Sequence, residues 1–239
     1  MKVAIHQPHY LPWLGYLAKW AAADLFVFLD TVQYEKSGWQ NRNRIKTRDG
    51  ARWLTVPVRA RLGTPIRAVQ VDENQPWQRR HLGTIEQAYG RTRAYGRFVA
   101  DLQAFYEKPW DRLAPLAVAS AMWLARAVGI TTPVRLASEL PVKAVDATDR
   151  LVAICQAVGA TVYLAGRDGA TYMDVAAFTR TGIEVQVQAY THPIYPQING
   201  EFVPFLSGLD LLLNSADDAL AIVRSGDSWT AVRAEAAPD

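Results

Sequence analysis

Side chains that can move protons or bind anions follow the first apolar segment of the chain. His6, Gln7 and His9 come directly after the apolar run from Val3 to Ile5, and Lys19 lies shortly downstream. A histidine can accept a proton near neutral pH, and a lysine offers a cation. Polar groups at the end of a buried strand cost free energy unless they find partners. The segment therefore predicts a site for general acid–base chemistry and anion binding.

The elements that must position these residues read as strand, helix and strand. Prolines and a glycine interrupt the first strand, and a helix runs from near Leu14 to about Ala23. A second apolar run, Leu25 to Leu29, then ends at Asp30. Such a unit predicts a parallel strand pair with a crevice at its carboxyl ends. The residues expected to bind substrate in this crevice are Gln7, His9, Tyr10, Trp13, Lys19 and Asp30. Packing in the core is the open alternative for Tyr10, Trp13 and Tyr16.

A polar segment after the second strand is the next candidate. Its amide, cationic and aromatic side chains offer directional donors for phosphate or carboxylate, and Gly38 beside Trp39 suggests a mobile cover. A solvated polar hairpin is the alternative. The substrate-binding residues expected here are Gln33, Lys36, Trp39, Asn41, Arg42 and Asn43, with Tyr34 and Arg44 in the same segment.

Positive charge is concentrated in one stretch, although the net charge is only +3. Between Lys36 and Arg67 there are nine lysines and arginines, and the only acidic residue is Asp49. Such a field attracts phosphate-bearing ligands such as a nucleotide, a nucleotide sugar, a phosphopantetheine carrier or RNA. A solvent-facing strand surface is the alternative for Arg52, Arg59 and Arg61.

The C-terminal part offers a third group of polar residues in a proline-rich segment. His192, Gln197 and Glu201 follow a strand expected at Ile183 to Gln188, and their backbone cannot pair along its length. They are expected to reach the same crevice, with His192 a near neighbour of His6. Asp210 follows the helix cap Ser207 and is expected to be structural.

The whole pattern predicts an α/β fold, a three-layer sandwich with a mainly parallel sheet assembled from both ends of the chain. Residues 1–225 are expected to form one domain, with a β-hairpin and a helical middle segment inserted at about 36–130. The hairpin is expected to pair 52–58 with 66–71. A second crossover is expected at 161–188, with the glycine-rich turn 165–169 at the lip of the crevice. Residues 226–239 are expected to form a flexible tail.

Several segments carry a family resemblance. HQPHYLPWLGYLAK, FVFLDTVQYEKSGWQNRNRI, YLAG, YMD and YPQINGEFVPFLSGLDLLLN, in this order over roughly residues 2 to 225, resemble the WbqC-like family. The resemblance implies a cytoplasmic bacterial protein associated with surface-polysaccharide biosynthesis, and it does not imply a reaction. Trp13 to Tyr16 also occupies the place of the His-x-Gly-His motif of nucleotidyltransferases and pantothenate synthetases, but Trp13 and Tyr16 replace both histidines.

The sequence lacks the motifs that are typical of several other classes of protein. Cys155 is the only cysteine, there is no Walker A or Gly-x-Ser-x-Gly motif, and no apolar run is long enough to span a bilayer. A cytoplasmic protein without membrane insertion is expected. The four histidines form no i, i+4 pair, so no tightly bound metal is expected, although His6 with Asp30 or His192 stays open.

Two hypotheses follow. The first is an amide-forming acyl- or aminoacyl-transferase, in which His6 or His192 takes a proton from an amine of a small molecule or nucleotide-linked amino sugar. Its expected partners are a phosphorylated small molecule, a nucleotide or a carrier-bound acyl donor, and its cofactor is unknown. The second is a non-catalytic binding module for RNA or an acyl carrier protein, with Trp39, Arg42, Arg44 and Lys46 as contacts. The mixture of His, Gln, Asp and Glu near strand ends favours the enzyme.

Overall fold

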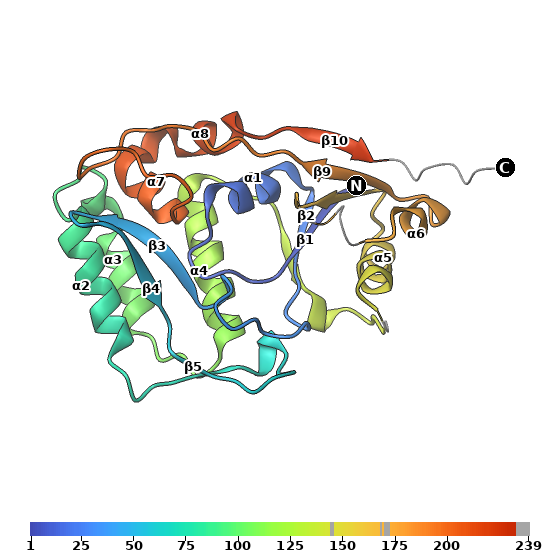
Figure 1. Cartoon of the computed structure of the whole chain (residues 1–239), viewed down its shortest axis with the longest axis horizontal. Helices are drawn as coiled ribbons and strands as arrows, with labels where there is room; N and C mark the ends of the chain where they lie inside the picture. Colours follow the sequence, from blue (N-terminus) through green and yellow to red (C-terminus); the bar gives the residue numbers. More distant parts are fainter. Residues whose placement is uncertain (144–145, 168, 170–172, 233–239) are drawn as a thin grey trace.

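A mainly parallel sheet forms the centre of the computed structural model, which describes residues 1–143, 146–167, 169 and 173–232. Its six strands have the order β10-β9-β8-β1-β2-β7 (Figure 1). All neighbours are parallel except β10, which runs antiparallel to β9. The strands are β1 (Lys2–His6), β2 (Leu25–Phe28), β7 (Val134–Leu136), β8 (Val162–Ala165), β9 (Glu184–Gln188) and β10 (Trp229–Val232). The predicted sheet assembled from both ends of the chain is confirmed.

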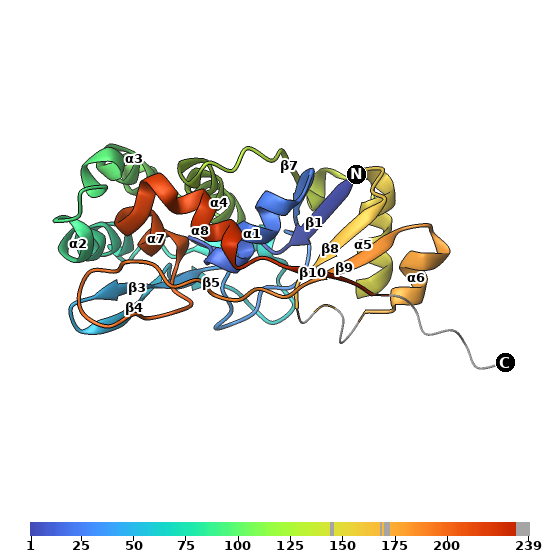
Figure 2. The ribbon, with the colours of Figure 1, turned by 90° about the horizontal axis from the view of Figure 1, so that it is seen from above.

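Helices cover both faces of the sheet, because alternate strand residues point to opposite sides. Ala4 and Phe26 pack in an apolar core against α1 (Leu14–Ala22), whereas Val3 and Val27 pack in a second core against α5 (Ala147–Ala157). The layer of α1 also contains α4 (Leu113–Val128), α7 (Gly208–Ser215) and α8 (Ala219–Ser225). The layer of α5 also contains α6 (Val175–Arg180). The three-layer sandwich is therefore confirmed (Figure 2).

The inserted segment contains the predicted hairpin, but its pairing differs. β4 (Gly50–Thr55) pairs with β3 (Arg42–Thr47), and only the short β5 (Val58–Arg59) pairs with β6 (Gln70–Val71). The expectation that 52–58 pairs throughout with 66–71 was wrong. Ile45 and Leu54 explain the observed choice, because both are buried in one apolar core with the helices of the insertion.

The middle segment is helical, as predicted. It comprises α2 (Trp77–Tyr89), α3 (Tyr95–Glu107) and α4, and the left-handed conformation of Gly129 (φ +100°) ends α4. Short 3-10 turns lie at Ile66–Ala68, Ala137–Glu139 and Ala216–Asp218. The hairpin with α2 and α3 lies at one end of the molecule and α5 with α6 at the other (Figures 1 and 2).

The C-terminal segment corrects one expectation. Trp229–Val232 form β10 on the edge of the sheet, so the expected tail from residue 226 does not begin there. Three predicted features lie partly outside the described residues. The parts outside are Asp168 of the glycine-rich turn, residues 170–172, which include the start of the family motif YMD, and residues 233–239 of the expected tail. Within the described part of the chain, no helix combines the length and apolar character that crossing a membrane requires.

Candidate functional site

A cavity of about 1100 Å³ lies at the carboxyl ends of β1 and β8. His6, at the end of β1, and Gln188 and Tyr190, at and just after the end of β9, all line it, so the ends of these two strands meet at one cavity as expected. His192, which was expected beside His6, does not line it. Topological switch points of α/β sheets commonly place ligand sites at this edge. The polar and aromatic lining consists of His6, Gln7, His9, Trp13, Tyr16, Lys19, Glu35, Trp39, Gln40, Arg44, Arg150, Tyr163, Arg167, Gln188, Tyr190 and Phe205.

His6 is half-buried at the last position of β1. Its Nδ1 lies 3.2 Å from the carbonyl oxygen of Gln7. Because a carbonyl can only accept, Nδ1 carries the hydrogen, and Nε2 of the neutral ring has a lone pair that no described residue occupies with a hydrogen bond. Burial, followed by the charge of Lys19 and the proximity of His9, lowers the pKa of His6 well below its ordinary value. His6 is therefore a neutral proton acceptor at neutral pH.

His9 packs beside His6 and is more deeply buried. The two rings meet edge to face with centroids 4.6 Å apart, and His9 stacks on Tyr16 at 5.0 Å. Burial and the charge of Lys19 lower the pKa of His9 to about 3. Its Nδ1 is buried and has no hydrogen-bond partner among the residues that the structure describes. A buried polar atom of this kind carries a free-energy cost that a ligand could relieve.

Lys19 forms the cationic part of the cavity wall. The residue is 2% exposed, and Nζ donates to the carbonyl oxygen of Ile5 at 3.2 Å. No salt bridge with a carboxylate is present for Lys19 within the described chain. Burial lowers its pKa to about 7, so charged and neutral forms coexist near neutrality.

The loop that carries His9 is held in a strained conformation. Leu11 has a φ of +45°, which is rare for a residue with a branched side chain. Its carbonyl oxygen accepts hydrogen bonds from Asn43 Nδ2 and Ser207 Oγ, both at 2.7 Å, and its N–H donates to Ser120 Oγ at 3.0 Å. Three distant segments thus fix the loop. Such strain persists only where the surroundings impose it.

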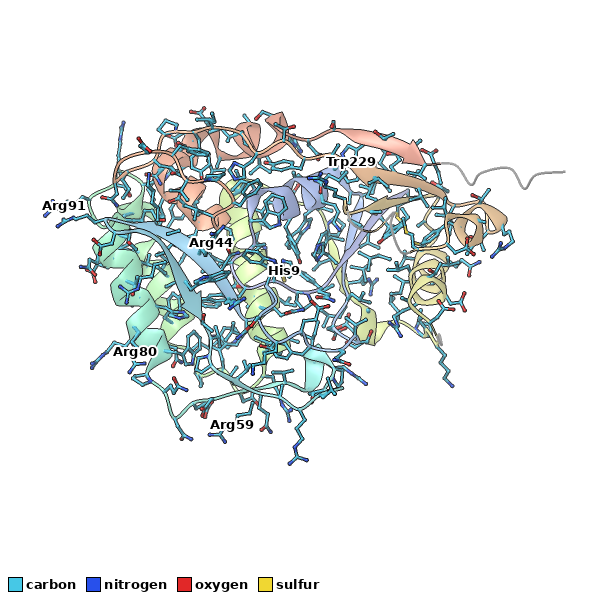
Figure 3. All side chains as sticks on the ribbon, viewed as in Figure 1. His9, Arg44, Arg59, Arg80, Arg91 and Trp229 are labelled. Carbon is cyan, nitrogen blue, oxygen red and sulfur yellow. The ribbon has the colours of Figure 1, made fainter. Side chains whose placement is uncertain are left out.

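The outer face of the hairpin forms an arginine and tryptophan stack at the cavity rim. The Arg42 guanidinium lies 4.3 Å from the Trp53 ring centroid and that of Arg44 lies 5.6 Å from it. Trp39 packs 5.5 Å from Trp53, and Trp39 and Arg44 line the cavity. Figure 3 shows His9 and Arg44 in the interior of the view, whereas Arg59 lies at the periphery. The rim therefore offers a cation and aromatic faces to a ligand.

Several sequence-predicted residues lie together on this cavity. His6, Gln7, His9, Trp13, Lys19 and Trp39 all line it. Gln7 Oε1 accepts a hydrogen bond from Gln40 Nε2 at 2.6 Å. The residues expected near the end of β1 are thus brought to one site.

Other residues that were expected to bind substrate form hydrogen bonds within the protein instead, away from the cavity. The Tyr10 hydroxyl bonds His81 Nδ1 at 3.0 Å, and Asp30 Oδ1 accepts from the N–H of Ser138 at 3.0 Å. Asn41 Nδ2 donates to the carbonyl of Val56 at 2.8 Å. Asn41 and Asn43 are buried structural amides, because both ends of each side chain are hydrogen-bonded. None of these four predicted residues, Tyr10, Asp30, Asn41 and Asn43, lines the cavity.

The candidate residues of the C-terminal segment also lie outside the cavity lining. Gln197 Nε2 donates to Asp210 Oδ2 at 2.8 Å, and the Lys46 ammonium is buried against the carbonyl groups of Gly200 and Glu201. Lys46 is therefore removed from the expected phosphate and RNA contacts. Gln33, Lys36 and Glu201 are exposed, and none of them lines the cavity.

His192 lies behind the aromatic rim. Its Nδ1 is 2.9 Å from the carbonyl oxygen of Pro193, and its ring packs 5.1 Å from that of Phe205. Phe205 lines the cavity, but His192 does not. His6 is thus the better placed of the two predicted bases, whose catalytic roles stay predictions.

Sequence reasoning missed Tyr16, Gln40, Arg150, Gln188 and Tyr190 as site residues. Arg150 lies in the first turn of α5, whose N-cap is Asp146, and only the packing of α5 against the sheet brings it to the cavity. Arg167 was signalled by the glycine-rich turn after a strand, and it lines the cavity as that position predicts. No group of three potential metal ligands is present among the described side chains.

Comparisons with known proteins place the chain in a family. The model of the WbqC-like protein family matches residues 7–222. A Mycobacterium tuberculosis protein named "Uncharacterized protein Rv1507c" is 35% identical over 223 residues, which cover 91% of this chain and 95% of that protein. No solved structure matches the chain significantly. The chain therefore belongs to the WbqC-like protein family.

Proposed function

We propose that this protein is an enzyme that transfers an activated acyl or aminoacyl group to an amine, forming an amide. The amine would belong to a small molecule or a nucleotide-linked amino sugar. The observation that carries the proposal is the free Nε2 of His6 in a cavity that also holds a buried lysine. A role in surface-polysaccharide or related biosynthesis is part of the proposal and rests on the family resemblance.

His6 would act as the general base. As the amine nitrogen attacks the acyl carbonyl carbon, the C–N bond forms and Nε2 accepts the proton that the nitrogen loses. The tetrahedral intermediate then collapses, the bond from carbon to the thioester sulfur or phosphate oxygen breaks, and the leaving group departs with the electron pair. The His6 imidazolium returns its proton to the leaving group or to solvent.

The positive charge of the cavity would support this reaction in two ways. In its charged form, Lys19 would attract an anionic group of a substrate into the cavity. Nearby positive charge also lowers the pKa of a bound amine, which favours its nucleophilic neutral form. These effects complement the proton acceptor at His6.

Phosphate groups of either substrate would bind nearer the rim. Arg44, Arg150 and Arg167 line the cavity, and Glu35 is the only acidic side chain in its described lining. A guanidinium can hold phosphate through two parallel hydrogen bonds. The excess of positive charge therefore favours an anionic donor such as an acyl phosphate, an acyl nucleotide or a phosphopantetheine thioester.

A direct search for amide formation tests the proposal. The protein is incubated with acetyl-coenzyme A or aminoacyl adenylates and a panel of amines that includes nucleotide-linked amino sugars. Amide products are detected by liquid chromatography and mass spectrometry. We expect a product that is formed by the wild type and lost with His6→Gln. A product whose formation rate is equal in both proteins would contradict the role of His6.

The second candidate function is a non-catalytic binding module for RNA or an acyl carrier protein. It is favoured by the exposure of Trp39 (38%) and Trp53 (42%) beside Arg42. Exposed tryptophans and arginines are the contacts that stack on bases and neutralise phosphates. Micromolar binding of single-stranded RNA or carrier protein that Trp53→Ala weakens, together with no amide formation, would support this function over the first.

A further inference from the structure

Lys19 is buried, and no carboxylate of the described residues forms an ion pair with it. Among the described residues its ammonium makes one hydrogen bond, to the neutral carbonyl of Ile5, although an ammonium can donate three. The ammonium faces the cavity opposite Gly166, where a methyl group added to the glycine would lie 3.8 Å from Nζ. The space next to Nζ is therefore bounded by backbone that carries no side chain.

Within the described chain, the neighbours of Lys19 offer it no paired negative charge, and Glu35, the one acidic side chain of the described lining, forms no ion pair with it. His6 and His9 are neutral at neutral pH, and the Tyr16 hydroxyl donates to the carbonyl of Gln7 at 3.1 Å. Arg167, in the loop that contains Gly166, adds a second positive charge to the lining. An anion supplied by a ligand would complete this environment, because a buried charge is stable only when it is paired.

We propose that Lys19 and the adjoining space at Gly166 form a subsite for a carboxylate of the substrate. The inference rests on the proposed function and narrows its substrate class, since one of the joined molecules would then carry a free carboxylate, as an amino acid does. The carboxylate would accept from the Lys19 ammonium, and burial would strengthen the pair relative to water.

A carboxylate fits this position better than a phosphate. It carries one negative charge, which one ammonium balances, whereas a phosphate monoester carries close to two at neutral pH. Guanidinium groups, which match phosphate with two parallel hydrogen bonds, are supplied elsewhere in the lining by Arg44 and Arg150. Arg167, which follows Gly166 in the chain, also lines the cavity, so inorganic phosphate is the competing anion in the test.

Nuclear magnetic resonance of the intact protein labelled with [ε-13C]lysine tests the subsite. The signal of Lys19 is assigned by its loss in Lys19→Met and is then titrated with pH, with and without saturating propionate. We expect propionate to move the Lys19 titration midpoint upward by at least one pH unit, a tenfold change in proton affinity, because the anion stabilises the charged amine. Propionamide, which has the same shape without the charge, should leave it unchanged.

Gly166→Ala provides a matched variant, because it puts a methyl group where the carboxylate would lie and keeps Lys19 in place. The variant should retain the Lys19 signal and lose most of the propionate effect. Gly96→Ala in α3, where an added methyl meets nothing within 4 Å, should behave as the wild type.

Three results would overturn the inference. One is a Lys19 titration that saturating propionate does not move, and another is an equal shift with propionamide. The third is a shift with inorganic phosphate at the same ionic strength but none with propionate, which would make the position a phosphate subsite. The measurement needs no turnover, so its failure leaves the base role of His6 standing, and a positive result holds even if amide formation is never observed.

Discussion

The Nζ atom of Lys19 lies 3.2 Å from the carbonyl oxygen of Ile5, the residue that precedes His6. This contact ties helix α1 to the end of strand β1 and brings a cation close to the proposed base. The charge of Lys19 is one of the causes that lower the pKa values of His6 and His9. The lysine therefore helps to keep both imidazoles neutral, and His6 ready to accept a proton.

The burial of Lys19 predicts a pH-dependent stability. Its pKa is about 7 in the folded protein and about 10.4 in an unfolded chain, so the unfolded state binds more protons between these values. Stability should therefore rise with pH in this window, by up to about 1.4 kcal/mol per pH unit. Below pH 7 the full cost of burying the charge is present.

Urea unfolding of the wild type and Lys19→Met at pH 6, 8 and 10 measures this effect. The variant keeps the apolar stem and has no group that titrates here. We expect the free energy of unfolding of the wild type, relative to the variant, to increase from pH 6 to pH 10. A difference that does not change with pH would mean that Lys19 has an ordinary pKa in the folded protein.

We expect Arg44 to strengthen the binding of phosphate groups, since it lines the cavity and is not part of an ion pair in the described structure. Arg44→Ala should weaken a phosphorylated ligand by roughly 1.5–3 kcal/mol, as expected when a hydrogen bond to a charged group is lost. Isothermal calorimetry with the best nucleotide ligand measures it. Arg59→Ala is the control, because Arg59 pairs with Asp72 and lies outside the lining. Equal losses in both variants would indicate a general charge effect.

Asn43 is expected to act through the backbone of the loop that carries His9 and Leu11. Asn43→Ala removes the donor to the carbonyl of Leu11 and should lower the free energy of unfolding by about 1–3 kcal/mol. Chemical unfolding measures the loss, with Lys36→Ala, an exposed position, as the control. If Asn43→Ala leaves stability unchanged but abolishes ligand binding, the original expectation of substrate contact would be restored.

Much of the fold could be predicted because its signals are local. The apolar runs at Val3 to Ile5 and Leu25 to Leu29, with a helix between them, specify a parallel pair, and the carboxyl end of a strand is then a defined place for His6. The helical middle segment follows from apolar periodicity in the same way. Each of these features depends on residues that are near one another in the chain.

What could not be predicted depends on contacts between distant segments. The polar pattern of Asn41 and Asn43 looks the same whether the amides bind a ligand or, as here, the carbonyl groups of Val56 and Leu11. The burial of Lys46 requires the loop near Gly200 to fold over the hairpin. Arg150 reaches the cavity only through the packing of α5. Sequence spacing contains no information on these long-range partners.

The most direct test of the account compares His6→Gln and His192→Gln in a turnover assay for amide formation. Because His6 lines the cavity with a free Nε2 and His192 does not line it, His6→Gln should lower kcat by roughly 100 to 10,000-fold with little change in substrate Kd. His192→Gln should keep kcat within about tenfold of the wild type, well short of the loss expected for a general base. If His6→Gln retains nearly full activity in a folded protein, His6 is not the base, and the central claim is contradicted.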